Sequence, residues 1–400
     1  MKTALNDLLV LDLTRVLAGP FCTMLLADLG ARVIKIETPW CGDDARAYGP
    51  FVNGESMYFA SLNRNKESLA IDLKSESGRA VFLRLVERAD VLVENFRPGT
   101  MEKLGLDYNR LRSVNPRLVY AACSGFGQTG PYRLKPAYDV IVQAMGGVMS
   151  LTGHPGGEPT RVGVSVGDIT AGLYTAVGIL AALEARHQTG SGQLVDVAML
   201  DCQVAILENA IARFQATGEV PRPIGNRHPS ITPFTAVKAS DAELVIAAGN
   251  DTLWARLCQA IERPELEKDP RYATNELRTQ NYESLQTILN EAFSGRERGE
   301  WLAILEEAGV PSGPINNIAD IMADPQVESR QMLVEIDHPV AGRIKTAGSP
   351  VKLSEVPTAG PRPSPLLGQH TRPILQDLLG MSVEEIEGLA KSRVVELGIS

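Results

Sequence analysis

The chain has 400 residues and a mass of 43.2 kDa, a length that predicts two or three structural units. Hydrophobic residues make up 44% and charged residues 22% of the sequence, which excludes a disordered chain, a collagen-like repeat and a disulfide-rich miniprotein. The net charge of −9 argues against non-specific binding to nucleic acid or to an anionic membrane. It leaves room for one anionic ligand in a local basic cleft.

The five cysteines are scattered, with no CxxC pair and no Cys/His ligand spacing. This pattern indicates reduced thiols and argues against a zinc site. The first residues lack the features of a signal peptide or presequence, and the most apolar helix-like stretch, 171–183, is too short to span a bilayer. We therefore expect a cytoplasmic protein without a metal or a membrane partner.

Strands and helices alternate in the first third of the chain. The hydrophobic pattern predicts strands at 8–14, 32–37, 68–73, 91–94 and 118–122, and helices at 20–29, 77–89 and 108–113. Strands that alternate with helices at this spacing form a parallel sheet with right-handed crossovers and helices on both faces. The expected fold class is α/β.

The middle of the chain is richer in glycine and proline. Loops are expected from 125 to 167, around one predicted helix at 138–150. A long apolar helix at 169–186, a strand at 194–199 and a helix at 201–217 follow.

A proline-rich stretch, 221–233, predicts a domain boundary. Beyond it we expect a β-hairpin (234–238 and 243–248) and helices at 251–261, 281–293 and 298–308, which together form a small α+β domain. The predicted domains are 1–220 for the first part of a large domain, 221–325 for the small domain, and 326–400 for the rest of the large domain. The tail is predicted to be β-rich at 334–353 and to end in a helix that opens with a capping box, Ser382 to Glu385.

Several common catalytic motifs are absent from the sequence. It has no GxGxxG after the first strand, no GxxxxGK[ST] and no GxSxG, which disfavours dinucleotide binding, P-loop nucleotide binding and α/β-hydrolase chemistry. His154, His187 and His338 fit surface turns. His228 differs, because it follows Arg227 in the linking loop and adds a second cationic donor there.

Asp168 is the most interesting carboxylate, since it follows Gly167 directly before the long apolar helix. The ordinary role of an aspartate at this position is to cap the helix. The functional alternative is a nucleophilic carboxylate, which substrate can approach closely because Gly167 has no side chain.

Basic residues recur at the ends of the predicted strands, where open α/β sheets bind ligands. A cluster at that edge would suit a phosphate-bearing ligand. These residues are Arg15, Lys35, Arg64, Lys66, Lys74, Arg97 and Lys103.

Taken together, several segments resemble the class III CoA-transferases, the family of formyl-CoA transferase and carnitine CoA-transferase. The resemblance is collinear over nearly the whole chain. It rests on VLDLTRVLAGP (10–20), GARVIKIETP (30–39), LNRNKESLAIDLK (62–74), VENFRPGTMEKLGL (93–106), SGFGQTGPY (124–132), GDITAGLYTAVGIL (167–180) and PLLGQHT (365–371). The stretches GNRHPSITPF (225–234) and GPINN (313–317) are similar to the subgroup that acts on short dicarboxylates, such as the acetyl-CoA:oxalate and succinate–hydroxymethylglutarate CoA-transferases.

The resemblance implies a Rossmann-like large domain built from both chain ends, a small inserted domain, and a homodimer of interlocked rings. It also implies transfer of CoA from a short acyl-CoA to a carboxylate, through an aspartyl anhydride and an aspartyl-CoA thioester. CoA would be a co-substrate, with no permanently bound cofactor. The donor and the acceptor stay open.

The same resemblance assigns the nucleophile to Asp168, with backbone N–H groups at the helix start supporting negative charge. The CoA contacts it implies are Arg15, Val16, Leu17, Ala18, Thr38, Ile71, Asp72, Leu73, Lys74, Asn95, Phe96, Arg97, Lys103 and Asp139. The glycine-rich loop over the active site of formyl-CoA transferase aligns with His228, Pro229 and Ser230. With Arg227, these residues are the expected acceptor site.

Two alternatives remain. An α-methylacyl-CoA racemase would share the fold, but racemases carry a His-Asp pair where Ala137-Tyr138-Asp139 stands here, and a tyrosine with a pKa near 10 is a poor proton-transfer base. The other alternative is an inactive CoA-binding protein, against which Asp168 in its motif argues.

Overall fold

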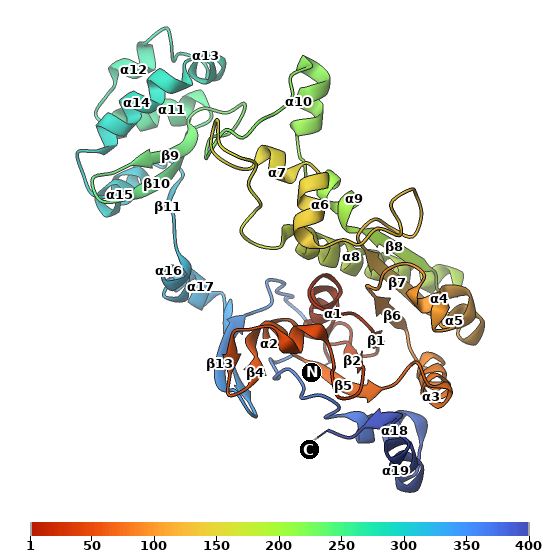
Figure 1. Ribbon diagram of the computed structural model, residues 1–400. Coiled ribbons are helices and arrows are strands. Elements are labelled where there is room, and N and C mark those ends of the chain that lie inside the picture. Colours follow the sequence, from red (N-terminus) through yellow and green to blue (C-terminus); the bar gives the residue numbers. More distant parts are fainter. Residues whose placement is uncertain (1, 399–400) are drawn as a thin grey trace. The chain divides into compact units, whose positions relative to one another are not determined.

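The structure is a computed structural model that describes residues 2–398, and it divides into two compact units (Figure 1). The large unit comprises residues up to 148, residues 161–212 and residues from 326 onward. The small unit comprises residues 149–160 and 213–325. The small unit thus contains the expected 221–325 domain together with two further stretches, 149–160 and 213–220.

The large unit is built on a seven-stranded sheet within the described residues, in the order β14-β5-β2-β1-β6-β7-β8. Every neighbouring pair is parallel except β14 with β5. The strands are β1 (Leu9–Asp12), β2 (Arg32–Glu37), β5 (Lys66–Ile71), β6 (Val91–Glu94), β7 (Val119–Ser124), β8 (Leu194–Ala198) and β14 (Val395–Glu396). The parallel α/β sheet is therefore confirmed, and β1 lies where the strand order reverses direction.

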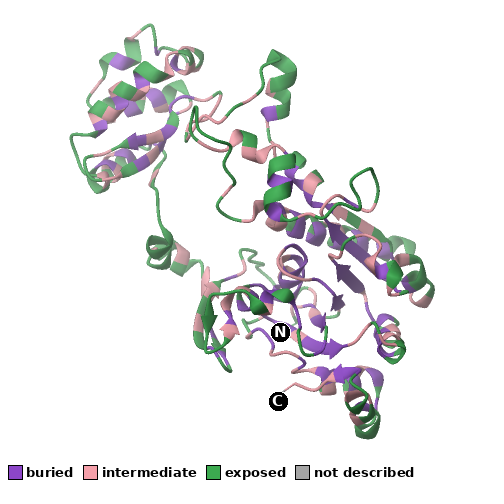
Figure 2. Cartoon of the chain, in the orientation of Figure 1, coloured by how far each residue is buried: buried purple, intermediate pink, exposed green. Residues whose placement is uncertain are grey.

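Alternate residues of each strand enter two different cores, because successive strand side chains point to opposite faces. On β1, Leu11 packs in one core and Val10 in the other. The first core is covered by α3 (Glu76–Val86), α5 (Tyr108–Val114), α18 (Thr371–Leu379) and α19 (Val383–Lys391). The second is covered by α1 (Ala18–Asp28) and α8 (Val166–Thr189). Figure 2 shows the resulting buried strands between partly exposed helices.

Two predicted helices are each divided in the structure. The segment 138–150 forms α6 (Asp139–Met145) and α7 (Val148–Leu151), which are separated at Gly146 and Gly147. Gly147 has φ +89, and a Cβ at Gly146 would lie 2.4 Å from Cβ of Gln203, so the chain needs glycine at this break. The segment 201–217 forms α9 (Met199–Ala205) and α10 (Ala210–Thr217).

Shorter elements complete the large unit and its borders. They are a 3₁₀ helix (Asp44–Ala47), β3 (Phe51–Val52), β4 (Glu55–Ser56), α2 (Met57–Leu62), α4 (Thr100–Lys103), α17 (Pro325–Ser329), β12 (Leu333–His338) and β13 (Gly342–Ala347). β12 and β13 pair as an antiparallel hairpin, as the β-rich prediction for 334–353 requires. His338 is buried in this hairpin, where Nδ1 accepts hydrogen bonds from the N–H groups of Val340 and Ala341, so its assignment to a surface turn was wrong.

The small unit contains an antiparallel sheet in the order β11-β10-β9, with its own hydrophobic core. Its strands are β9 (Phe234–Lys238), β10 (Glu243–Ala247) and β11 (Ser312–Pro314). Its helices are α11 (Asp251–Ala260), α12 (Glu265–Lys268), α13 (Asn275–Gln280), α14 (Tyr282–Phe293), α15 (Arg298–Glu307) and α16 (Ile318–Met322). This segment therefore combines an antiparallel sheet with helices.

Helix α8 is three residues longer at each end than predicted, and it is the one helix in residues 2–398 that is long and apolar enough to cross a membrane. It packs on the sheet and against α1 through Ala176, Ile179 and Leu183. These contacts are those of a core helix, in which one face is buried by the sheet and the other remains open.

Candidate active site

Asp168 does not cap its helix. Helix α8 begins at Val166, and Ser165 occupies the N-cap position without a side-chain capping hydrogen bond. Asp168 is therefore the third helical residue, and no described residue forms a hydrogen bond or an ion pair with its carboxylate. The capping interpretation was wrong, and the carboxylate is free for chemistry.

A second aspartate, Asp139, fixes the backbone beside Asp168. Its Oδ1 accepts the Gly167 N–H at 2.9 Å, and its Oδ2 accepts a hydrogen bond from Gln143 Nε2 at 2.8 Å. Arg161 forms an ion pair with the same Oδ2 at 3.4 Å. Gln143 Oε1 in turn accepts the Val162 N–H at 2.9 Å, so two side chains of α6 hold the segment that enters α8.

The first N–H groups of α8 already have acceptors. The N–H of Val166 donates to Val164 O, that of Gly167 to Asp139, and that of Ile169 to Ser165 O. Our expectation that the N–H groups at the helix start stabilise negative charge is therefore wrong for these three.

The surroundings of Asp168 favour its neutral form. Burial and, second, the negative charge of Asp139 raise the pKa of Asp168 to about 7. Burial and, second, the negative charge of Asp168 raise the pKa of the Tyr58 phenol on α2 to about 12. Tyr58 thus keeps its proton, and nothing in its sequence context had indicated it.

A cavity of about 370 Å³ lies in the large unit at the carboxyl ends of β5, β2, β1 and β6. This is the edge where open α/β sheets bind ligands. Half of the expected CoA contacts line it: Arg15, Thr38, Ile71, Asp72, Leu73, Lys74 and Phe96. The other residues of the wall were not expected from the sequence: Leu13, Thr14, Ile36, Glu37, Cys41, Gly42, Asp43, Thr100 and Leu104.

The cavity combines an apolar wall with basic side chains. Leu73, Phe96 and Leu104 pack against the adjoining core. Arg15 forms an exposed ion pair with Asp44 at 2.8 Å, whereas Lys74 has no carboxylate partner among the described residues. Such a lining suits a ligand with a flat apolar part and phosphate groups.

The loop that follows β1 is held in an unusual conformation. Val16 has φ +66, which is rare for a β-branched residue. Its N–H donates to Asp43 Oδ1 at 3.0 Å, and Asp43 forms a buried ion pair with Lys35 at 2.9 Å. Asn95 exchanges two hydrogen bonds of 2.8 Å with the backbone of Arg15. Val16 and Asn95 therefore shape the cavity loop without lining the cavity.

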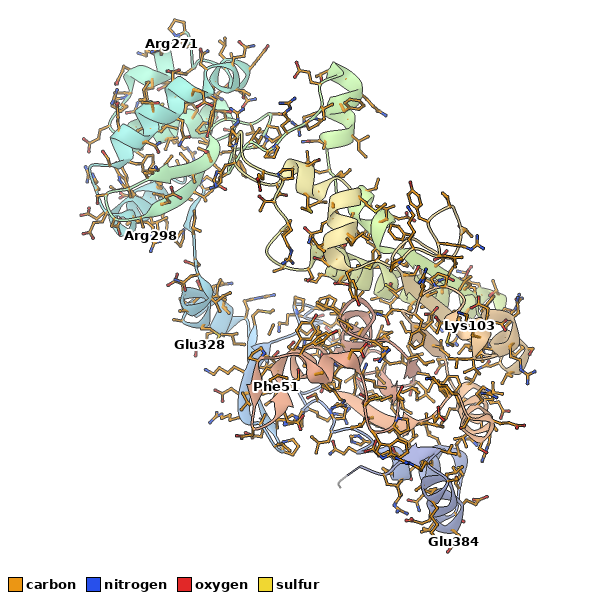
Figure 3. All side chains as sticks on the ribbon, viewed as in Figure 1. Phe51, Lys103, Arg271, Arg298, Glu328 and Glu384 are labelled. Carbon is orange, nitrogen blue, oxygen red and sulfur yellow. The ribbon has the colours of Figure 1, made fainter. Side chains whose placement is uncertain are left out.

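The remaining expected CoA contacts lie outside this cavity. Leu17 and Ala18 form the start of α1, Arg97 donates to the carbonyl oxygen of Leu134, and Lys103 is exposed on α4 (Figure 3). Asp139 lies with Asp168 rather than at the cavity.

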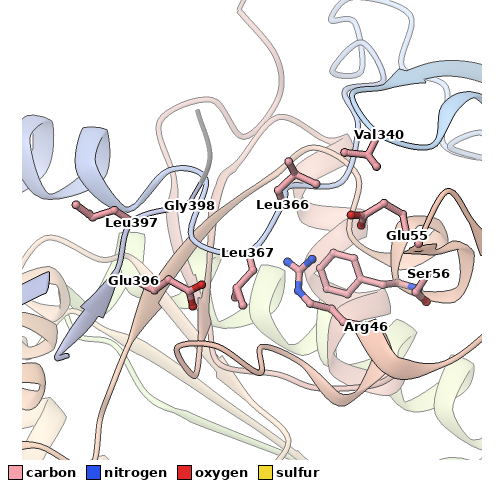
Figure 4. Close-up of a pocket in the computed structure, with 11 residues that line it drawn as sticks. Arg46, Glu55, Ser56, Val340, Leu366, Leu367, Glu396, Leu397 and Gly398 are labelled. Atoms are coloured by element: carbon pink, nitrogen blue, oxygen red, sulfur yellow. The ribbon is translucent and has the colours of Figure 1, made fainter.

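A second cavity of about 400 Å³ lies between the β3–β4 hairpin and the C-terminal segment (Figure 4). Glu55 and Glu396 line it, and its one basic side chain, Arg46, is already held by Glu37 in two hydrogen bonds of 2.7 Å. Although it is slightly larger, it offers a phosphate no unpaired cation. The first cavity is therefore the better candidate for CoA.

The four expected acceptor residues, 227–230, lie in the small unit in the loop before β9. The Arg227 guanidinium stacks on the ring of Tyr282, with 4.3 Å to the ring centroid. His228 packs against Phe234.

The comparisons with known proteins agree on one family. The profile of CoA-transferase family III matches residues 5–371. The chain is 49% identical over 354 residues to an acetyl-CoA:oxalate CoA-transferase of Acetobacter aceti, covering 88% of this chain and 90% of that protein. It is 42% identical over 393 residues to a succinyl-CoA:glutarate CoA-transferase of Mus musculus, covering 98% and 90%.

A solved structure shares the fold. The crystal structure of a CAIB/BAIF family protein from Brucella suis superposes with a TM-score of 0.84 at 41% identity, covering 94% of this chain and all of that one. The relatives named above are transferases, which favours transfer over the racemase alternative. The chain belongs to CoA-transferase family III.

Proposed function

We propose that this enzyme transfers CoA from a short acyl-CoA to a dicarboxylate, with Asp168 as the nucleophile. The acceptor class is supported by its relatives, whose names include oxalate, glutarate and mesaconate. One observation supports the role of Asp168. Its side chain lies in the first turn of α8 and does not cap the helix, and Asp139 fixes the neighbouring backbone by accepting the Gly167 N–H.

In the first half-reaction, a carboxylate oxygen of Asp168 attacks the thioester carbonyl of the donor, and the C–S bond breaks. CoA thiolate leaves, and a mixed anhydride of Asp168 and the donor acid remains. The thiolate then attacks the carbonyl of Asp168, which releases the donor acid and leaves an aspartyl-CoA thioester.

In the second half-reaction, the acceptor carboxylate attacks that thioester and again displaces CoA thiolate. The thiolate attacks the acceptor carbonyl of the new anhydride, which yields the product thioester and restores the Asp168 carboxylate. Each intermediate is prone to hydrolysis, so a half-buried nucleophile helps by limiting the access of water. The raised pKa of Asp168 also makes its ionised form a stronger nucleophile.

We assign CoA to the 370 Å³ cavity of the large unit. Its apolar wall suits the adenine ring, and Arg15 and Lys74 suit the phosphate groups. Arg227 and His228 are assigned to the acceptor carboxylate that does not react. We further propose an interlocked homodimer in the cytoplasm, where the five free cysteines would stay reduced.

The test compares Asp168→Asn with Asp201→Asn. Asp201 is a matched control, because it is also the third residue of its helix, α9, and is exposed. Asp168→Asn should lower transfer at least a thousandfold and keep acyl-CoA binding, whereas Asp201→Asn should transfer like the wild type. An Asp168→Asn variant that retains a tenth of the activity would refute the nucleophile.

A chemical trap tests the intermediate itself. Wild-type enzyme incubated with acyl-CoA and no acceptor should form a species that hydroxylamine or borohydride captures. Peptide mapping should place it between Arg161 and Arg186, and Asp168→Asn should give none. A label on a cysteine contradicts the carboxylate mechanism.

A further inference from the structure

Helix α19 ends in a turn that proteins usually build with glycine. The backbone N–H groups of Arg393 and Val394 donate back into the last turn of the helix, at 3.0 and 2.9 Å, and Arg393 has φ +58. Glycine is common at this position, because a side chain is unfavourable at positive φ. Gly30 and Gly309 occupy it after α1 and α15. An arginine is therefore less favourable at the end of α19 than a glycine would be.

The side chain of Arg393 lies on Trp40, in the loop that follows β2. The guanidinium is 4.6 Å from the centroid of the indole ring. Trp40 itself has φ +62, which is uncommon for a bulky residue, and its backbone N–H donates to the carboxylate of Glu396. A residue in a strained conformation persists only where its surroundings hold it. Both the ring and the backbone of Trp40 are held by the C-terminal segment 393–396.

The C-terminal segment 393–396 is itself anchored beside the 370 Å³ cavity. Val394 and Val395 are buried in the core of the large unit, and Val395 pairs with Ile71 on β5. The carbonyl oxygen of Val394 accepts the N–H of Asp72 at 2.8 Å. Ile71 and Asp72 both belong to the wall of the cavity. The segment is therefore fixed to one edge of the cavity.

Trp40 belongs to the loop 38–43, which forms another part of the same wall. The loop residues that line the cavity are Thr38, Cys41, Gly42 and Asp43. Within the loop, the N–H of Gly42 donates to Thr38 O at 2.8 Å. Trp40 stands at the tip of the loop and is 52% exposed. The C-terminal segment 393–396 thus connects this loop to the β5 edge of the cavity.

We propose that Arg393 and Glu396 are positioning residues for CoA, which hold Trp40 and with it the loop 38–43 in the shape that the cavity requires. The inference rests on the proposed function, because this is the cavity to which we assign CoA. Without the two contacts, Trp40 leaves its strained conformation and the wall of the cavity shifts. CoA then binds less tightly, whereas Asp168 on α8 keeps its surroundings.

Arg393→Gly tests this role against a purely structural one. The substitution removes the guanidinium and suits the positive φ, so the melting temperature should equal or exceed that of the wild type. The Kd of free CoA, measured by isothermal titration calorimetry, should nevertheless rise about fivefold. Glu396→Ala should raise it about tenfold. In steady-state assays, both variants should raise the KM for acyl-CoA and leave kcat little changed.

Gln331→Gly is the matched control. Gln331 occupies the same position after α17, with φ +52 and the same pair of backbone hydrogen bonds, and it does not line the cavity. Its substitution should affect the melting temperature in the same direction and leave the Kd of CoA unchanged. Lys74→Met tests the cavity itself, because it removes a cation assigned to the phosphates of CoA, and it should weaken CoA binding.

The outcomes separate the two proposals. If Lys74→Met weakens CoA binding and neither Arg393→Gly nor Glu396→Ala does, the positioning role is overturned while the assignment of CoA to the cavity stands. If Lys74→Met binds CoA like the wild type, that assignment is overturned, and the positioning role with it. An Arg393→Gly variant that loses melting temperature and kcat at an unchanged KM, or a Gln331→Gly variant that loses as much CoA affinity, also overturns the positioning role.

Discussion

At the scale of single residues, Asp168 and Asp139 form a pair of like charges with unequal surroundings. Asp139 accepts hydrogen bonds from Gly167 and Gln143 and forms an ion pair with Arg161. Asp168 has none of these partners, and burial together with the charge of Asp139 raises its pKa to about 7. When two carboxyl groups share a site, the one with fewer donors holds its proton more tightly. Asp168 is therefore the member whose ionisation can be seen in the kinetics.

This arrangement predicts a pH-dependent activity. Only ionised Asp168 is a nucleophile, so kcat/KM for the acyl-CoA should rise with pH and level off above about 7. At pH 6 it should be about a tenth of the plateau, because each pH unit below the pKa reduces the ionised fraction tenfold.

The second arm uses Asp139→Asn, which removes the neighbouring charge and should shift the rising limb to lower pH. Initial rates from pH 5.5 to 8.5 for both proteins provide the measurement. The titrating phosphate of CoA is common to the two, so it cannot produce a difference between them. A flat wild-type profile, or a limb that Asp139→Asn does not move, would contradict the assignment.

Asp168, the proposed nucleophile, was singled out by its motif, but its position in the helix was predicted wrongly. Gly167 followed by Asp168 before an apolar helix has the sequence of a capped helix start, and local preference alone favours a cap. The helix in fact begins at Val166, because the α6 side chains Asp139 and Gln143 hold the preceding segment through its backbone N–H groups. Such contacts between distant segments leave no trace in a single sequence.

At the scale of elements, hydrophobic periodicity predicted β2, β6 and β9 to the residue. These are local signals: β2 alternates with period two, and β6 is a short apolar run. Local signals failed at 138–150, where one continuous helix was predicted but the helix is interrupted at Gly146 and Gly147. The break there depends on a close approach to Gln203, 57 residues further along, and periodicity cannot report such a contact.

Seven of the expected CoA contacts meet in one cavity because they end neighbouring parallel strands. The wall residues that were missed, such as Leu13 and Leu104, are ordinary apolar residues in the sequence. Only the order of the strands in the sheet brings them to the carboxyl ends of the strands, where the cavity lies.

Helices α1 and α8 cross closely at Gly172. A Cβ at Gly172 would lie 2.7 Å from the carbonyl oxygen of Ala18 and 3.0 Å from the ring of Phe21. Gly172→Ala should therefore push the helices apart and cost about 1–3 kcal/mol of stability, despite the better helix propensity of alanine. Because the cavity loop leads into α1, the KM for acyl-CoA should rise as well.

Gly163→Ala is the matched control, since a Cβ there meets nothing within 4 Å. Its melting temperature should stay within about 2 °C of the wild type. Differential scanning calorimetry of the two variants makes the comparison. If Gly172→Ala had the same melting temperature as Gly163→Ala, the close approach of α1 and α8 would not contribute to stability.

At the scale of the whole molecule, the large unit leaves an apolar surface open. Leu173, Tyr174 and Val177 on α8 are 46%, 45% and 62% exposed, and they recur along one face of the helix. Exposed apolar residues on the adjoining helices are Val140, Ile141 and Met145 of α6 and Val204 of α9. The three helices pack against one another, and exposed apolar residues that gather on neighbouring helices are typical of interaction surfaces. This apolar surface gives the proposed homodimer a place to form.

This surface leads to a prediction about assembly. The wild type should have twice the 43.2 kDa mass of one chain in light scattering. Val177→Arg places a charge in the middle of the patch and should reduce the yield of dimer at least tenfold. Val383→Arg is the control, because Val383 is 46% exposed at the start of α19 on a different element and should leave the dimer intact.

Interlocking adds a stricter requirement than dimerisation alone. Two rings threaded through each other separate only when one chain unfolds, so subunit exchange has to pass through the unfolded state. Two wild-type preparations with different affinity tags should therefore yield no mixed dimer after a day at 25 °C, even under dilution that dissociates an ordinary dimer. Mixed dimers should form when the two are denatured together and refolded. Mixed dimers from native protein within hours would show that the subunits associate side by side, and a mass of one chain would refute the homodimer.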